Sequence, residues 1–320
     1  MTEGPTLGEL GEFAVIDAIT AGRRHGDAVR VGPGDDAAVL DAPDGRVVAS
    51  TDMLVQGRHF RLDWSSPEQV GRKAIAQNAA DIEAMGAVPT GFLVAFGAPV
   101  DTPASAVTAL SDGLSAEAAR AGASIIGGDL VASPQWTVSV TALGDLAGRP
   151  AVLRSGASAG DVVAVAGELG RSGAGYALLD AGAAEPALAA LVDRHLVPQP
   201  PYGQGARAAR AGATAMTDVS DGLIIDLRQL AAASGVGIDL HTARLAADRD
   251  ALTAAAVALG ADPWAWIFGG GEDHALVACF PAAAVLPQGW RPIGAVTAEH
   301  DGVTVDGGGW TGRPGWDSFG

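Results

Sequence analysis

Short β-rich runs alternate with helical segments along almost the whole of this 320-residue chain, and this alternation constrains the fold more than any other feature. Apolar side chains recur at helical spacing over residues 10–21, 66–86 and 103–121, whereas 46–50, 90–96, 123–126 and 137–143 are β-rich. A second series of strands and helices runs from 161 to 279. The pattern predicts a protein of mixed α and β structure.

The segment GRPAVLRSGASAG, from Gly148 to Gly160, is rich in Gly, Ser and Ala and has little periodicity, which is typical of a domain junction. A chain of 320 residues is longer than one typical domain and short for three. We therefore predict two domains, residues 1–148 and residues 149–320.

The balance of charge and the single cysteine exclude several classes of protein. Asp and Glu number 37 against 20 Lys and Arg, for a net charge of -17, which argues against a nucleic-acid partner. Cys279 alone can build neither a disulfide framework nor a cysteine metal site, so a reducing cytoplasm is the expected compartment. We find no signal peptide and no apolar run of about 18 residues, so we expect no membrane partner.

Acidic side chains gather beside small residues at four places where a predicted strand or loop ends, and one more acidic residue, Asp81, lies on the helix over 66–86. Taken singly, each cluster fits ordinary turn or helix-cap chemistry. Together, with glycine beside most of them, they favour binding of polyphosphate and Mg²⁺, which prefers oxygen ligands. We expect these carboxylates to converge in the fold. The clusters are Gly34-Asp35-Asp36, Ser50-Thr51-Asp52, Gly127-Gly128-Asp129 and Asp218-Val219-Ser220-Asp221-Gly222.

The common phosphate-binding signatures are missing. The chain has no G-x-x-x-x-G-K-[ST] motif and none of the signature elements of protein kinases. The glycine-rich run GELGRSGAG, from Gly167 to Gly175, has the wrong spacing for a dinucleotide fingerprint, so we interpret it as a strand-to-helix turn. Phosphate chemistry in this chain must therefore use another architecture.

Seven motifs, in this order and spacing, resemble the thiamine-monophosphate kinase family, and a C-terminal Gly315-Trp316-Asp317 extends the resemblance to nearly the whole chain. The motifs are VGPGDDAAVL (31–40), STDMLVQGRHF (50–60), NAADIEAMGA (78–87), IIGGD (125–129), LRSGA (153–157), DVSDGLIIDL (218–227) and GGGEDHAL (269–276).

The resemblance implies an α+β fold with two mixed α/β domains of the aminoimidazole ribonucleotide synthetase type. It implies that the N-terminal domain binds ATP and magnesium and pairs through its sheet in a homodimer, and that the C-terminal domain completes the active site. Several Mg²⁺ ions would be cofactors, and ATP and thiamine monophosphate would be substrates. The implied metal ligands are Asp36, Ser50, Thr51, Asp52, Asp81, Asp129, Asp218 and Asp221; the implied ATP contacts are Gly128, Asp129, Arg154 and Ser220; the implied thiamine-phosphate contacts are His59, Glu272 and Trp316.

The implied reaction is direct transfer of the γ-phosphoryl group of ATP to an acceptor that is already an anion, so no general base is required. Charge would be stabilised by Asp52, Asp129 and Asp218 through bound cations, and by Arg154. Structural alternatives stay open for the substrate contacts. His59 could be a packed core histidine, Glu272-Asp273 could cap a helix, and Trp316 could fix the C-terminal segment.

The chain departs from the family pattern at two places, Ala79-Ala80 before Asp81 and His274-Ala275 after Asp273, and the second leaves the role of His274 open. Another ATP-using member of the same superfamily is the nearest rival, although the cysteines typical of selenophosphate synthetases and hydrogenase-maturation enzymes have no counterpart here. A non-catalytic metal- or nucleotide-binding protein is a rival of another class. Against it, the acids span nearly 200 positions and no EF-hand loop occurs.

Overall fold

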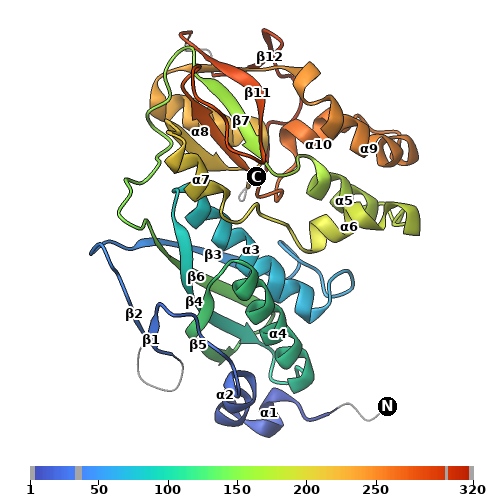
Figure 1. Cartoon of the computed structure of the whole chain (residues 1–320). Coiled ribbons are helices and arrows are strands. Elements are labelled where there is room, and N and C mark those ends of the chain that lie inside the picture. Colours follow the sequence, from blue (N-terminus) through green and yellow to red (C-terminus); the bar gives the residue numbers. More distant parts are fainter. Residues whose placement is uncertain (1–3, 33–37, 300–301, 317–320) are drawn as a thin grey trace. The chain divides into compact units, whose positions relative to one another are not determined.

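The computed structural model describes residues 4–32, 38–299 and 302–316. The chain divides into two compact units (Figure 1). Unit 1 comprises Met1–Ile82 and Val88–Gly148, and unit 2 comprises Glu83–Ala87 and Arg149–Gly320. No helix in the described ranges is long and apolar enough to cross a membrane.

Unit 1 is built on a four-stranded sheet with the strand order β3-β6-β4-β5. Strands β4 and β5 are parallel, and the other neighbours are antiparallel. Two short strands, β1 and β2, form a separate ribbon. The elements are α1 (Leu7–Leu10), α2 (Glu12–Thr20), β1 (Val29–Val31), β2 (Val39–Leu40), β3 (Val48–Val55), α3 (Pro67–Ala84), β4 (Val88–Ala98), α4 (Ala104–Arg120), β5 (Ser124–Ala132) and β6 (Thr137–Asp145).

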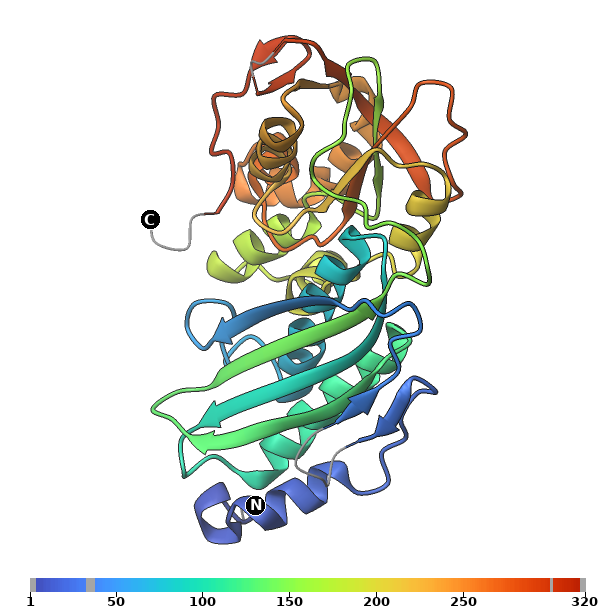
Figure 2. The ribbon, with the colours of Figure 1, turned by 90° about the vertical axis from the view of Figure 1, so that its left-hand side faces the viewer.

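Helices α3 and α4 cover one face of this sheet, and Figure 2 shows them behind its four strands. The two helices approach closely because each has a glycine at the contact. A Cβ on Gly71 would lie 2.2 Å from the carbonyl oxygen of Leu110, and a Cβ on Gly113 would lie 2.0 Å from that of Glu68. Side chains of one strand face make the core beneath the helices: Phe92, Val94, Phe96, Val138, Val140 and Ala142 are buried.

The opposite face of the same sheet is exposed and carries apolar side chains. Met53, Leu93 and Val131 are 53%, 38% and 54% exposed. The register places Met53 opposite Ser139 and Leu93 opposite Thr141, in the rows that alternate with the buried ones. Strand alternation therefore leaves one face of unit 1 partly apolar and uncovered by its own helices.

Among its described residues, unit 2 holds a seven-stranded sheet with the order β13-β12-β9-β11-β7-β10-β8, in which β12 and β9 are parallel and the other neighbours are antiparallel. Its strands are β7 (Val162–Ala166), β8 (Ala215–Asp218), β9 (Gly237–Leu240), β10 (Leu276–Phe280), β11 (Trp290–Thr297), β12 (Val303–Val305) and β13 (Gly308–Gly309). Its helices are α5 (Arg171–Asp180), η1 (Pro186–Leu188), α6 (Ala189–Leu196), α7 (Gln204–Arg210), α8 (Leu223–Ser234), η2 (Thr242–Arg244), α9 (Ala246–Leu259) and α10 (Pro263–Gly269).

Both faces of the central strands of unit 2 are buried. Along β7, Val163 and Val165 join the larger core with residues of α5, α8, α9 and α10, whereas Ala164 and Ala166 face a second core with Ala208 of α7. Cys279 lies in the larger core, as expected from the apolar stretch around it, and burial raises the pKa of its thiol to about 12.

The end of α3 and the residues after it belong to unit 2 because they form hydrogen bonds with residues of that unit. The buried carboxylate of Glu83 accepts hydrogen bonds from the backbone N–H groups of Gly203 (2.7 Å) and Gly205 (2.8 Å), at the start of α7. Val152 N–H donates to the carbonyl of Met85, and Arg149 donates to that of Gly86. Residues 83–87, which the sequence reading placed in the first domain, therefore pack with unit 2.

Candidate functional site

In unit 1, strand β3 and helix α3 bring three of the predicted oxygen ligands together. Ser50 and Asp52 lie two apart on β3, so both point toward the helix-covered face. The Ser50 hydroxyl donates to Asp81 Oδ2 at 2.6 Å, and Gln77 Nε2 donates to Asp52 Oδ2 at 3.3 Å. The backbone N–H of Asp52 donates to the side-chain oxygen of buried Asn78. The face shared by Asn78 and Asp81 thus packs on a strand.

The sequence reading expected β3 to end at Ser50-Thr51-Asp52, and this was wrong: the strand continues to Val55 and the triplet lies in its middle. Thr51 consequently points to the opposite face from Ser50 and Asp52, where its hydroxyl donates to the carbonyl of Val140. The Thr51 hydroxyl therefore does not lie with the oxygen atoms of Ser50 and Asp52.

His59 lies in the turn that follows β3. Its ring Nδ1 accepts a hydrogen bond from the backbone N–H of Val55 at 3.0 Å. The backbone N–H of His59 donates to the carbonyl of Val55. The neighbouring Phe60 is buried, whereas His59 is half-buried. The ring is therefore fixed by the backbone rather than packed in the core, and Nδ1 is the acceptor nitrogen.

Gly128 and Asp129 lie within β5, which continues to Ala132 instead of ending before them as expected. A Cβ on Gly128 would lie 1.9 Å from the carbonyl oxygen of Val94 on β4, so the close approach of two strands explains this glycine without a ligand. Asp129 is exposed and pairs with Ala95. Because β5 and β3 are opposite edges of a four-stranded sheet, about 14 Å apart, one chain does not bring Asp129 to Asp52 and Asp81.

In unit 2, the loop Asp218–Gly222 between β8 and α8 is organised by a single buried carboxylate. Oδ2 of Asp226, in the first turn of α8, accepts the backbone N–H groups of Ser220 (3.0 Å), Asp221 (3.1 Å) and Gly222 (3.1 Å). Burial, reinforced by the charge of Asp218 and then of Asp221, raises the pKa of Asp226 to about 7. Three acidic side chains thus crowd one end of α8.

His274 contacts one of these acids. Its Nδ1 lies 3.2 Å from Asp218 Oδ2, and both side chains are buried. The backbone N–H of His274 donates to the carbonyl of Val219 at 2.8 Å. The residue that departs from the family pattern therefore holds the carboxylate of a predicted metal ligand.

The same loop is bonded to both predicted substrate contacts of unit 2. The backbone N–H of Glu272 donates to the carbonyl of Ser220 at 2.7 Å, and that of Trp316 donates to the carbonyl of Asp221 at 2.8 Å. The Trp316 side chain is 40% exposed, and the guanidinium carbon of Arg313 lies 5.4 Å from its ring centroid. Trp316 thus fixes the C-terminal segment through its backbone while its ring faces outward.

Asp273 has the structural role that the sequence left open for the Glu272-Asp273 pair. Its carboxylate accepts the backbone N–H groups of Gly170 (2.5 Å) and Ser172 (2.9 Å), at the N-terminus of α5. Burial raises its pKa to about 7. Glu272 is directed elsewhere: its Oε2 lies 3.3 Å from Nδ1 of His195.

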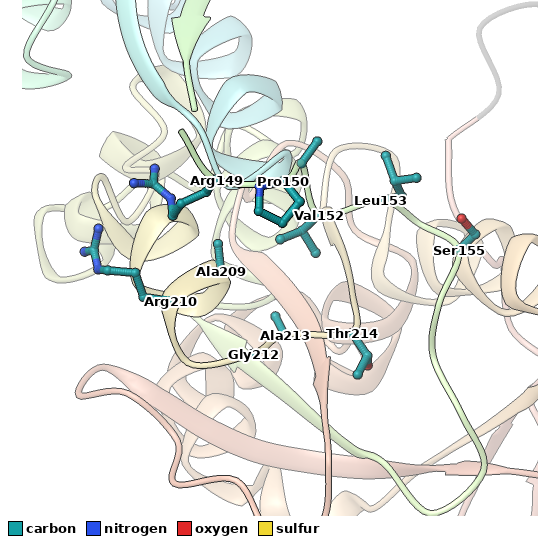
Figure 3. A pocket seen from close by; sticks show the side chains of 11 residues that line it. Arg149, Pro150, Val152, Leu153, Ser155, Ala209, Arg210, Gly212, Ala213 and Thr214 are labelled. Carbon is teal, nitrogen blue, oxygen red and sulfur yellow. The ribbon is translucent and has the colours of Figure 1, made fainter. Parts of the chain in front are cut away.

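Arg154 is exposed and anchored beside β8. Its Nε donates to the hydroxyl of Thr217, the residue before Asp218, at 3.3 Å. Its neighbours Leu153 and Ser155 line a separate open cavity of about 460 Å³, with Arg149 and Arg210 at one side of it (Figure 3). Arg154 is not among the residues that line this cavity.

The oxygen donors of these residues are of the kind that Mg²⁺ prefers. Over residues 4–32, 38–299 and 302–316, however, no three His, Cys, Asp or Glu side chains gather closely enough to hold a metal by themselves. Such a cluster is not required, because Mg²⁺ usually binds through one or two carboxylates together with phosphate oxygens and water. The donor sets Ser50, Asp52 and Asp81 in unit 1, and Asp218 and Asp221 in unit 2, fit that mode. Asp36, also predicted as a ligand, lies outside the described residues.

Two residues of this site were missed from the sequence. Asp226 gives a weak signal, since an acid in the first turn of a helix commonly accepts the N–H groups there. His195, on α6, gives none, because its partners lie 23 and 77 positions away in the chain.

Comparisons with known proteins agree with this architecture. Residues 34–146 match the family model for AIR synthase related protein, N-terminal domain, and residues 158–306 match that for the C-terminal domain. A thiamine-monophosphate kinase of Mycobacterium tuberculosis H37Rv is 66% identical over 319 residues, covering 100% of this chain and 95% of the relative. One of Corynebacterium glutamicum is 45% identical and covers 100% and 96%. The solved structure "AaThiL complexed with AMPPCP and TMP" has a TM-score of 0.79 at 32% identity, covering 98% of this chain and 99% of that one.

Proposed function

Because the chain belongs to the thiamine-monophosphate kinase family, within the AIR synthase related proteins, we propose that it transfers the γ-phosphoryl group of ATP to thiamine monophosphate. The products are thiamine diphosphate and ADP. The relative solved with AMPPCP and TMP supports both substrates.

One observation in this chain carries the proposal. The loop Asp218–Gly222 is predicted to bind ATP and metal. Its backbone carbonyls accept hydrogen bonds from the N–H groups of Glu272 and Trp316, which are predicted to bind the thiamine substrate. Direct transfer requires that donor and acceptor phosphates meet in line. A loop bonded to residues for both substrates supports that arrangement.

The residues of the chain supply charge and orientation rather than proton transfer. The acceptor phosphate is an anion at neutral pH, so we assign no general base. Arg154 offers a guanidinium fork for phosphate oxygens beside β8, and Asp226 and His274 hold the loop and the Asp218 carboxylate in place. Mg²⁺, when bound, would neutralise the repulsion between the phosphates. Its ligands would be Asp36, Ser50, Thr51, Asp52, Asp81, Asp129, Asp218 and Asp221.

A homodimer is part of the proposal. The exposed apolar face with Met53, Leu93 and Val131 supports pairing of the unit 1 sheets, and a second copy would supply the contacts that one chain lacks around Asp129. We expect Leu93→Asp to give a monomer in light scattering, whereas Val257→Asp, on an exposed position of α9, should stay dimeric. A wild-type monomer at micromolar concentration would overturn this part.

The activity itself is tested by ADP release with and without thiamine monophosphate. Release that depends on thiamine monophosphate supports the kinase, and release without it, or none, contradicts it. Asp52→Asn should abolish turnover with the fold intact, because a neutral amide of similar shape is a poor ligand for a cation. The matched control is Asp63→Asn, at an exposed carboxylate paired with Arg61, which should keep full turnover. The cytoplasmic location stays a prediction.

A further inference from the structure

The loop that carries Glu272 has an unfavourable backbone conformation. Glu272 and His274 have positive φ angles of 62° and 49°, which residues other than glycine rarely adopt. The loop is held in this conformation by two backbone hydrogen bonds. The N–H of Glu272 donates to the carbonyl of Ser220, and the N–H of His274 donates to the carbonyl of Val219. Such strain persists only where the surroundings determine the conformation, and it is common at binding sites.

The side chain of Glu272 is directed by a buried histidine. Nδ1 of His195, in the last turn of α6, lies 3.3 Å from Glu272 Oε2 and 3.2 Å from the hydroxyl of Ser172. The His195 side chain is 9% exposed, whereas that of Glu272 is 29% exposed. The contact therefore joins the Glu272 carboxylate to a buried ring, while part of the Glu272 side chain stays accessible.

Helix packing sets the position of the histidine. Helices α5 and α6 approach at Gly175, where a Cβ would lie 2.2 Å from the carbonyl oxygen of Leu191 and 3.0 Å from Cβ of His195. The ring of Tyr176 packs edge-on against that of His195, with centroids 5.5 Å apart. The imidazole thus has little freedom to turn away from Glu272.

We propose that His195 is a positioning residue for the thiamine substrate, holding the Glu272 carboxylate where it meets the cationic thiazolium ring. This inference rests on the proposed function. A glutamate side chain that is not held loses rotamer freedom when it binds. A histidine that has already ordered it removes that cost, so affinity for the cationic substrate depends on His195 and affinity for ATP does not.

Two substitutions of similar polarity separate positioning from simple packing. Asparagine places its amide nitrogen near the position of Nδ1, whereas glutamine places it near Nε2. We expect His195→Gln to raise KM for thiamine monophosphate about tenfold, the equivalent of the freed rotamer entropy, with KM for ATP and kcat little changed. His195→Asn should keep most of the wild-type affinity for thiamine monophosphate. The control His241→Ala removes another histidine of unit 2, 3.4 Å from Asp239, and should change neither constant.

A double-mutant cycle tests whether the effect passes through Glu272. In the Glu272→Gln background, His195→Gln should add little to the rise in KM, because the carboxylate that it positions is already gone. Additive effects, an unchanged KM in His195→Gln, or equal losses in the Gln and Asn variants would each overturn the inference. Failure of wild-type enzyme to release ADP with thiamine monophosphate would instead overturn the proposed function.

Discussion

Replacing Asp226 by asparagine should remove a loss of folding stability that unit 2 undergoes as the pH rises. In the folded chain this carboxylate is 2% exposed, and burial together with Asp218 and Asp221 raises its pKa from 3.8 to about 7. Between these pH values the native state keeps a proton that the unfolded chain has released, so stability falls as the pH rises from about 4 to about 7. Above pH 7 the carboxylate is ionised in both states and the full loss is present.

The difference of about 3 pKa units corresponds to a loss of about 4 kcal/mol, or about 10 °C in Tm for a unit of this size. Asparagine resembles the protonated acid and keeps an oxygen for the three backbone N–H groups. We therefore expect Asp226→Asn to lie within about 1 kcal/mol of wild type near pH 4.5 and to be about 4 kcal/mol more stable at pH 8.5. Asp226→Ala, which removes the acceptor, should lie about 1–3 kcal/mol below the asparagine variant at both pH values.

Thermal unfolding followed by circular dichroism from pH 4.5 to 8.5 measures these differences. EDTA should be present, because a cation on Asp218 or Asp221 would change the charge that faces Asp226. Parallel curves for wild type and Asp226→Asn across this range would refute the reasoning. A gain in the stability of Asp226→Asn over wild type that is larger at pH 4.5 than at pH 8.5 would refute it too.

Three further predictions use other parts of the chain. Gly128→Ala should lower stability by about 1–3 kcal/mol in urea unfolding, because its Cβ would meet the backbone of Val94. Gly127→Ala should lower stability less, because its Cβ would meet only the end of a leucine side chain at 3.1 Å, and equal losses in the two variants would contradict this. Trp316→Ala should raise KM for thiamine monophosphate by about tenfold or less in steady-state assays and leave KM for ATP unchanged, since an exposed aromatic face can bind a cationic ring. An unaltered KM for thiamine monophosphate would show that Trp316 is not part of the substrate site. The thiol of Cys279, buried and with a pKa of about 12, should react with Ellman's reagent at pH 8 only in denaturant, and prompt reaction of the folded chain would show that the thiol is accessible.

Long periodic helices were predictable because their pattern repeats over several turns. The helix expected over 66–86 is α3 (Pro67–Ala84), and the one expected over 103–121 is α4 (Ala104–Arg120). Strand ends were less predictable. Strand β5 runs through Gly127 and Gly128, residues of low strand propensity, and at Gly128 only glycine fits against β4. Strand β11 was missed since it contains Pro292 and Gly294, where its register shifts against β7.

The amino-acid sequence by itself determined the family, the mixed α and β class and the identity of the chemical groups, because motif order and residue type are local properties of the chain. Tertiary structure decided which of those groups meet. Strand alternation separated Thr51 from Ser50 and Asp52, and strand order set Asp129 at the far edge from them. Helix packing brought His195 to Glu272 across 77 positions. Contacts of this kind depend on backbone geometry that no short stretch of sequence encodes.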